Sequence, residues 1–73
     1  MAIIKNVTGR FVAIDKDVLE DTRLSYGAKG VYCVICANNN EVEIDIYKAD
    51  DMLRSYLAEL YFAGYITKED NYE

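Results

Sequence analysis

The clearest pattern in the chain is a helical spacing of apolar residues over residues 26–37. Apolar side chains recur there three and four positions apart, which places them on one face of a helix. The members of this face are Ala28, Val31, Tyr32, Ile35 and Cys36. Ser25 stands directly before the pattern, where a hydroxyl group can cap a helix. Gly27 and Gly30 each weaken a helix by up to about 1 kcal/mol, so we expect close packing beside them.

A second helical pattern covers residues 50–63. Its apolar face is formed by Leu53, Tyr56, Leu57, Leu60, Tyr61 and Gly64. Asp50 and Asp51 stand at the start, where the helix dipole favours carboxylates. Gly64 follows the pattern and predicts the stop of the helix, because glycine adopts the left-handed backbone conformation that ends many helices.

Three short stretches have the pattern of strands instead. Residues 11–14 and 65–67 are short and largely apolar or β-branched, and residues 41–46 alternate polar and apolar side chains with a period of two. A short distorted helix over residues 41–47 is the competing interpretation of that region. Asp15 predicts a capped helical turn through residues 18–20, and the Asn triplet at residues 38–40 predicts a helix stop and a loop.

The order of these elements predicts an α+β fold: two main helices packed on a short antiparallel sheet of two or three strands. The 73 residues are sufficient for one domain, residues 1–73. Residues 68–73 are polar, and we expect them to form a frayed tail.

Two stretches resemble winged helix-turn-helix domains of phage and plasmid replication initiators, also called replisome organisers. The first runs from residues 11–14 through Leu19-Glu20-Asp21 to Leu24-Ser25-Tyr26-Gly27-Ala28-Lys29-Gly30-Val31-Tyr32. The second is Leu57-Ala58-Glu59-Leu60 with Ala63-Gly64-Tyr65-Ile66. The resemblance implies a winged-helix fold that binds DNA. The helix-turn-helix is degenerate, because only residues 41–49 remain for its other helix. The chain also ends soon after Ile66, and the usual bases of the reading helix are missing.

Composition excludes several classes of function. The chain has no His, two Cys, no long apolar run and no basic region before an apolar stretch. We therefore expect neither a membrane span nor a secretory signal, and we expect a reducing, cytoplasmic location, that of the host cell if a phage encodes the protein. No nucleophile–base pair and no phosphate-binding loop are recognisable, so the sequence predicts no enzyme, no catalytic residue and no cofactor.

Cys33 and Cys36 form a CxxC spacing. A redox motif needs its first Cys at a helix N-terminus, whereas both residues fall in the second half of the predicted helix. A zinc site needs four ligands, which only a dimer could supply. We interpret the two residues as packing residues and predict no metal site.

The two halves of the chain differ in charge. Residues 1–37 carry five Lys or Arg and four Asp or Glu, whereas residues 38–73 carry three and nine. The predicted helix over residues 50–63 therefore presents an acidic, partly apolar face, which suits contact with a protein better than with DNA. The residues predicted to carry this contact are Met52, Arg54, Ser55, Glu59 and Phe62. The hypothesis is a small phage or mobile-element regulator or inhibitor of a protein, for example one that handles nucleic acid.

Three alternatives stay open. As a dimeric, DNA-binding winged-helix module for replication or transcription, the chain would use Lys29, Lys48, Arg54 and Lys68. Glu41, Glu43 and Asp45 would share one face of a strand, where carboxylates about 6.6–7 Å apart resemble the phosphates of DNA. These three acids are candidates for charge mimicry or a solvated strand face. A homodimer that buries Met52 and Phe62 is the third alternative.

Overall fold

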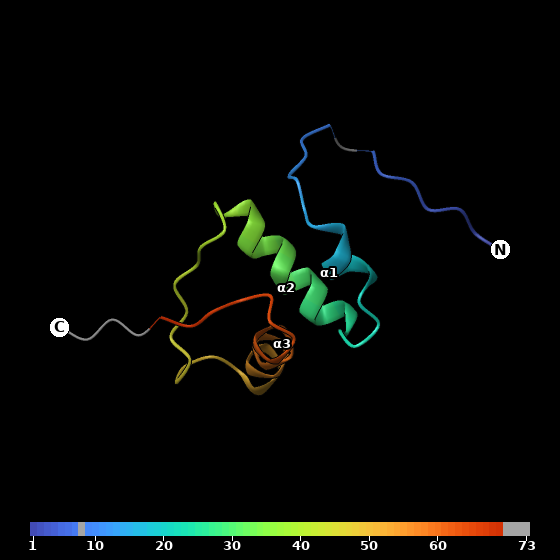
Figure 1. The fold of residues 1–73 in the computed structure, drawn as a ribbon. Helices are drawn as coiled ribbons and strands as arrows, with labels where there is room; N and C mark the ends of the chain where they lie inside the picture. The colour runs from blue at the N-terminus through green and yellow to red at the C-terminus, as the bar shows by residue number, and fades with distance from the viewer. Residues whose placement is uncertain (8, 70–73) are drawn as a thin grey trace.

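The computed structural model describes residues 1–7 and 9–69, and within them it contains three helices and no strand (Figure 1). Helix α1 spans Lys16–Glu20, α2 spans Tyr26–Ala37 and α3 spans Asp51–Phe62. Both long helices and the short turn after Asp15 are confirmed. The predicted α+β winged-helix fold is wrong, because no sheet is present in the described part of the chain.

The ends of α2 follow from side chains that satisfy its free backbone groups. Ser25 Oγ accepts a hydrogen bond from the N–H of Ala28 at 3.1 Å. At the other end, Asn39 and Asn40 have φ angles of 61° and 65°, and the N–H of Asn40 donates to the carbonyl of Ile35 at 3.0 Å. Asparagine tolerates this left-handed conformation better than most residues, so the predicted helix stop is confirmed.

Helix α3 is bounded in the same way. Asp50 Oδ1 accepts from the N–H of Leu53 at 2.7 Å, and Gly64 adopts a φ of 87°. The N–H of Tyr65 then donates to the carbonyl of Leu60 at 3.0 Å, which closes the last turn. The glycine stop is confirmed, whereas Asp50 was predicted at the helix start only for its charge and not as a side-chain cap.

The core lies where α2 and α3 cross and α1 covers one end of the contact. In Figure 1, α2 lies nearly in the plane of view whereas α3 is seen almost end-on, so the two helices cross steeply. The buried cluster consists of Val18, Leu24, Ala28 and Leu60. A Cβ atom at Gly27 would clash with the ring of Tyr56 on α3, which explains one helical glycine. Gly30 has nothing within 4 Å of its Cβ position, so the expectation of close packing fails there.

The three predicted strands are absent because none of these segments has a strand partner. Residues 11–14 leave the helical body, and residues 65–67 follow α3 as an extended chain. Residues 41–46 keep the expected alternation, with exposed side chains at 41, 43 and 45 and half-buried ones at 42, 44 and 46. At Asp45 the chain turns, since its Oδ1 accepts from the N–H of Tyr47 at 3.0 Å. The region is therefore neither the strand nor the short helix of the two interpretations.

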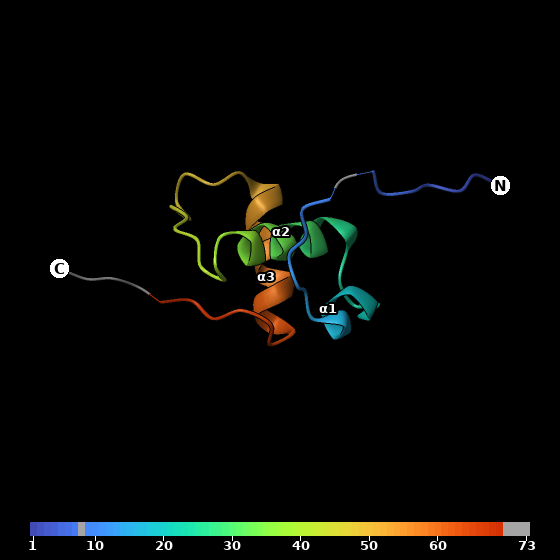
Figure 2. The same cartoon turned by 90° about the horizontal axis from the view of Figure 1, so that it is seen from above.

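Residues 1–7 and residues 66–69 lie on opposite sides of the helical body, as Figures 1 and 2 both show. Residues 68 and 69, the first part of the predicted frayed tail, are exposed and outside any helix. The remainder of that prediction, residues 70–73, lies outside the described residues. Tyr61, which the helical pattern placed in the core, is 51% exposed instead.

Candidate functional site

The outward side of α3 carries two large apolar side chains. Met52 is 64% exposed and Phe62 is 84% exposed, and Ser55 lies exposed on the same helix. The ring of Phe62 packs edge-on against Tyr61 with 5.5 Å between centroids. We call Met52, Ser55 and Phe62 the outer α3 surface. The structure leaves these three predicted contact residues accessible.

Glu59, also predicted as a contact residue, is half-buried and engaged within the chain. Its Oε1 accepts from the N–H of Ser25 at 2.8 Å, and its Oε2 accepts from Ser25 Oγ at 2.7 Å. In a capping box, a Glu within the same helix bonds the N–H of the capping residue. Here Glu59 supplies that group from α3 to α2. These hydrogen bonds lower the pKa of Glu59, first through the Ser25 N–H and then through its hydroxyl. Glu59 therefore holds the two helices together.

Arg54 is paired with a neighbour on its own helix. Its Nη2 lies 2.6 Å from Oδ1 of Asp51, and both side chains are exposed. The other three residues of the DNA-binding alternative come from separate elements: Lys29 from α2, Lys48 from the turn before α3, and Lys68 from the C-terminal segment. The Lys29 ammonium group lies 5.6 Å from the ring centroid of Tyr26. The four cationic residues therefore lie on four different parts of the chain and do not form one ridge along a helix.

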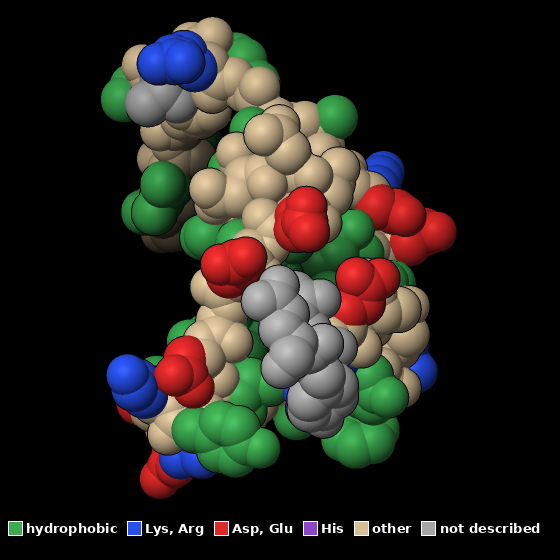
Figure 3. Space-filling view, turned by 90° about the vertical axis from the view of Figure 1, so that its left-hand side faces the viewer, with side chains coloured by type: hydrophobic (Ala, Val, Ile, Leu, Met, Phe, Trp, Pro, Cys, Tyr) green, Lys and Arg blue, Asp and Glu red, His purple; other side chains and the backbone are tan. Residues whose placement is uncertain are grey.

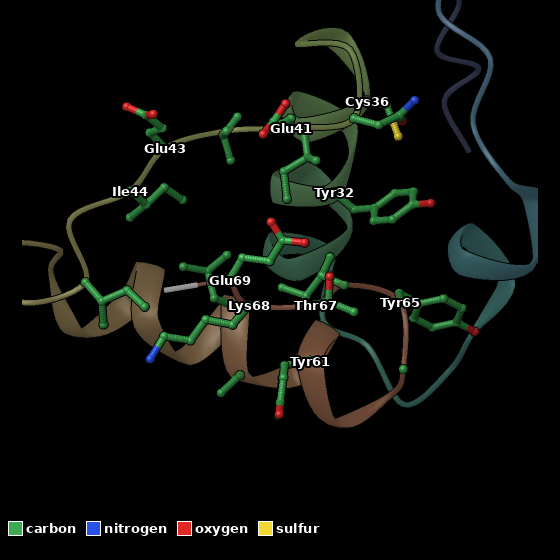
Figure 4. A pocket seen from close by; sticks show the side chains of 18 of the residues that line it. Tyr32, Cys36, Glu41, Glu43, Ile44, Tyr61, Tyr65, Thr67, Lys68 and Glu69 are labelled. Atoms are coloured by element: carbon green, nitrogen blue, oxygen red, sulfur yellow. The ribbon is translucent and has the colours of Figure 1, made fainter. Parts of the chain in front are cut away.

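An open groove of about 970 Å³ lies between residues 39–46, the two long helices and the C-terminal segment. Figure 4 shows Glu41 and Glu43 on one rim and Lys68 and Glu69 across from them. Its apolar lining includes Ile35, Val42, Ile44, Leu57 and Ile66. This groove was not predicted from the sequence. The period-two alternation of residues 41–46 was the available indication, because it turns three apolar side chains toward the body of the protein.

The acids proposed for charge mimicry, Glu41, Glu43 and Asp45, are all exposed along the outer side of residues 41–46. Figure 3 views the side of the molecule that carries this segment. Asp and Glu side chains are spread over the middle of that face, and Lys and Arg side chains lie mostly toward its margins. The segment therefore presents carboxylates to solvent while its apolar side chains line the groove.

A polar cluster fixes the C-terminal segment to the α1 side of the body. Asp21 accepts from Nε and Nη2 of Arg23, with a shortest distance of 2.7 Å, and from the hydroxyl of Tyr65 at 2.8 Å. These hydrogen bonds, those of the Arg23 side chain first, hold the pKa of Asp21 well below its ordinary value of 3.8. The Tyr65 ring also meets Tyr32 edge-on, at 6.4 Å between centroids. Tyr65 therefore anchors one wall of the groove.

The two cysteines are free thiols in the second half of α2, with Cys36 buried and Cys33 half-buried. Neither lies at a helix N-terminus, where a reactive thiolate is stabilised. Among the described residues, no three His, Cys, Asp or Glu side chains gather as a metal-binding group. None of the described helices has the length and apolar content that a membrane span requires.

Comparisons with known proteins return no match: no protein-family model, no curated protein and no solved structure is similar to this chain. The winged-helix resemblance therefore has no support beyond the residues that suggested it.

Proposed function

We propose that this chain is a non-enzymatic regulator that binds a protein through the outer α3 surface. The observation that carries the proposal is the exposure of Met52 and Phe62 on a helix whose opposite side fills the core. Large apolar side chains on a helix face are typical of surfaces that bind another protein.

The charges around this surface favour a polypeptide over a nucleic acid. Binding to DNA takes most of its affinity from several Lys or Arg side chains that neutralise phosphates. Residues 38–73 offer three bases against nine acids, and Arg54 is paired with Asp51. A phosphate backbone at this face would meet mostly carboxylates. A phage or mobile-element origin, suggested by the winged-helix resemblance, stays a prediction.

Affinity capture from a cell extract tests the proposal. The wild-type chain and the Met52→Ser/Phe62→Ser variant are immobilised side by side, with and without nuclease treatment. We expect the wild type to retain the same protein after nuclease treatment and the variant to lose it. Both substituted side chains are exposed, so helical content by circular dichroism should be unchanged.

A matched control removes two exposed apolar side chains from α2. Tyr26→Ser/Val34→Ser alters residues that are 89% and 58% exposed but lie outside α3. This control should capture the partner as well as the wild type does. Equal capture by the α3 variant, or a ligand that disappears on nuclease treatment and on raising the salt concentration, would contradict the proposal and favour the DNA-binding alternative.

A further inference from the structure

Residues 1–7 and 9–14 lie outside the helical body with exposed apolar side chains, and we call residues 1–14 the arm. Ile4 is 91% exposed and Phe11 is 76% exposed, and no described residue of the arm belongs to a helix or strand. The charged side chains of the arm are Lys5 and Arg10, and it contains no acid. An arm with this composition has β-forming side chains and a net positive charge but covers almost none of its apolar surface.

Residues 41–46 carry the opposite charge, and their backbone hydrogen bonding is incomplete. Among the described residues, no hydrogen-bond partner is found for the backbone N–H groups of residues 42–46. The segment already has the side-chain alternation of a half-buried strand, with Val42, Ile44 and Ile46 turned inward. It carries three acids and no base. It therefore has what the edge strand of a sheet offers to another strand.

The arm and this segment complement each other in three respects. Two bases on the arm meet three acids on the segment, and neither the described residues of the arm nor residues 41–45 belong to a helix or strand of their own. The exposed apolar side chains of the arm match the apolar lining of the groove. Fourteen extended residues span roughly 46–50 Å, which is more than enough to reach another molecule. In Figure 1 the arm ends on the side of the molecule opposite the 38–50 connection, so it is displayed away from its own groove.

We propose that two copies of this chain exchange their N-terminal arms. The arm of each copy lies along residues 41–46 of the other, adds backbone hydrogen bonds to that segment and covers the groove with its apolar side chains. The dimer supplies the strand pairing that the alternation of residues 41–46 predicts. The described part of the single chain does not form this pairing. The buried core within the described residues consists of only five side chains, so additional burial between copies stabilises both.

Charge reversal on either side tests the exchange. The arm variant is Lys5→Glu/Arg10→Glu. The rim variant, on the segment that the arm would contact, is Glu41→Lys/Glu43→Lys. Each variant alone places like charges opposite each other, so we expect its dimer to dissociate about tenfold more readily than that of the wild type. Mixed in equal amounts, the two variants form a heterodimer in which both arm contacts again join opposite charges. Sedimentation velocity and native mass spectrometry measure these species.

Hydrogen exchange supplies an independent measurement of the same contact. Alternate backbone amides within residues 42–46, those facing the arm, should be protected in the wild-type dimer and exchange freely in either variant alone. Lys16→Glu/Lys29→Glu changes the net charge as much as the arm variant does but lies outside the arm and the groove, so it should remain dimeric.

Three results would contradict the proposed exchange of arms between two copies. The first is a wild-type chain that stays monomeric up to its solubility limit, including the case in which its own arm protects residues 42–46. The second is a mixture of the two variants that forms no heterodimer. The third is a dimer that persists in both variants, which would place the contact elsewhere, for example on Met52 and Phe62.

Discussion

The helical body and the non-helical segments of this protein differ in how many of their backbone hydrogen bonds and apolar contacts form within the single chain. In α2 and α3, capping side chains close the helix ends and the buried faces meet each other. The arm and residues 41–46 have side chains equally suited to regular structure, yet no strand is present at residues 1–7, 9–14 or 41–46. A helix makes its backbone hydrogen bonds within one segment, whereas a strand needs a second one.

The difference also explains where the tertiary contacts of the body lie. Glu59 joins α3 to the N-terminus of α2, and Tyr65 joins the C-terminal segment to Asp21 and Tyr32. Within the described part of the chain, the backbone N–H groups of residues 42–46 make no such contact. The body is thus held by specific contacts, and the extended segments remain available for a partner.

Removing the most buried side chain should have the largest effect on the body. Leu60 is 0% exposed, and Leu60→Ala should lower the free energy of unfolding by about 2–5 kcal/mol, through lost burial and the cavity left behind. Met52→Ala on the exposed side of the same helix should change it by less than about 0.5 kcal/mol. Urea denaturation followed by circular dichroism measures both. Similar losses for the two variants would mean that α3 does not pack as described.

The two glycines of α2 should respond in opposite directions to the same substitution. Gly27→Ala forces a methyl group against the Tyr56 ring and should cost about 1–3 kcal/mol, net of the gain in helix propensity. Gly30→Ala meets open space and should stabilise by up to about 1 kcal/mol. Thermal unfolding of the two variants distinguishes them. Stabilisation by both would show that α2 and α3 are not in close contact at Tyr56.

Acid should weaken the body through two carboxylates whose pKa values are lowered on folding. Asp21 and Glu59 are held ionised by Arg23 and Ser25, so their stabilising contributions are present above the ordinary carboxylate pKa values, 3.8 and 4.5, and are lost as the pH falls below them. Asp21→Asn and Glu59→Gln should each lower stability at pH 7 and flatten its decline in acid. Urea midpoints between pH 7 and pH 2 measure this, and a decline as steep as that of the wild type would contradict the assignment.

Substitutions in the arm should have the smallest effect on the monomer. Ile4→Ala and Phe11→Ala remove side chains that are largely exposed, so each should change stability by less than about 0.5 kcal/mol at a concentration where sedimentation shows only monomer. At concentrations that favour the dimer, the same variants should be less stable than the wild type. A large loss in the monomer would mean that the arm packs on its own body.

The helices could be predicted from the sequence because their determinants are local. Ser25, Asp50 and Gly64 mark helix ends by their own side-chain or backbone properties, and the apolar spacing identifies the packed faces. The error at Tyr61 shows the limit of that spacing, because the residue lies at the edge of the apolar face and the opposing helix does not cover it. Of the predicted contact residues, Met52 and Phe62 are accessible, whereas Glu59 is used inside the chain. No pattern in the sequence predicts the hydrogen bond that Glu59 accepts from Ser25, 34 positions away.

The sequence by itself determined where α2 and α3 begin and end and that residues 41–46 alternate between a polar and an apolar side. Only the tertiary structure decided that these residues stay unpaired and that Glu59 caps another helix. It also decided that a groove opens beside α3. Helix ends depend on interactions within a few residues, which the order of amino acids contains directly. Strand pairing and polar contacts between helices depend on which distant segments meet, and that is fixed only when the whole chain packs.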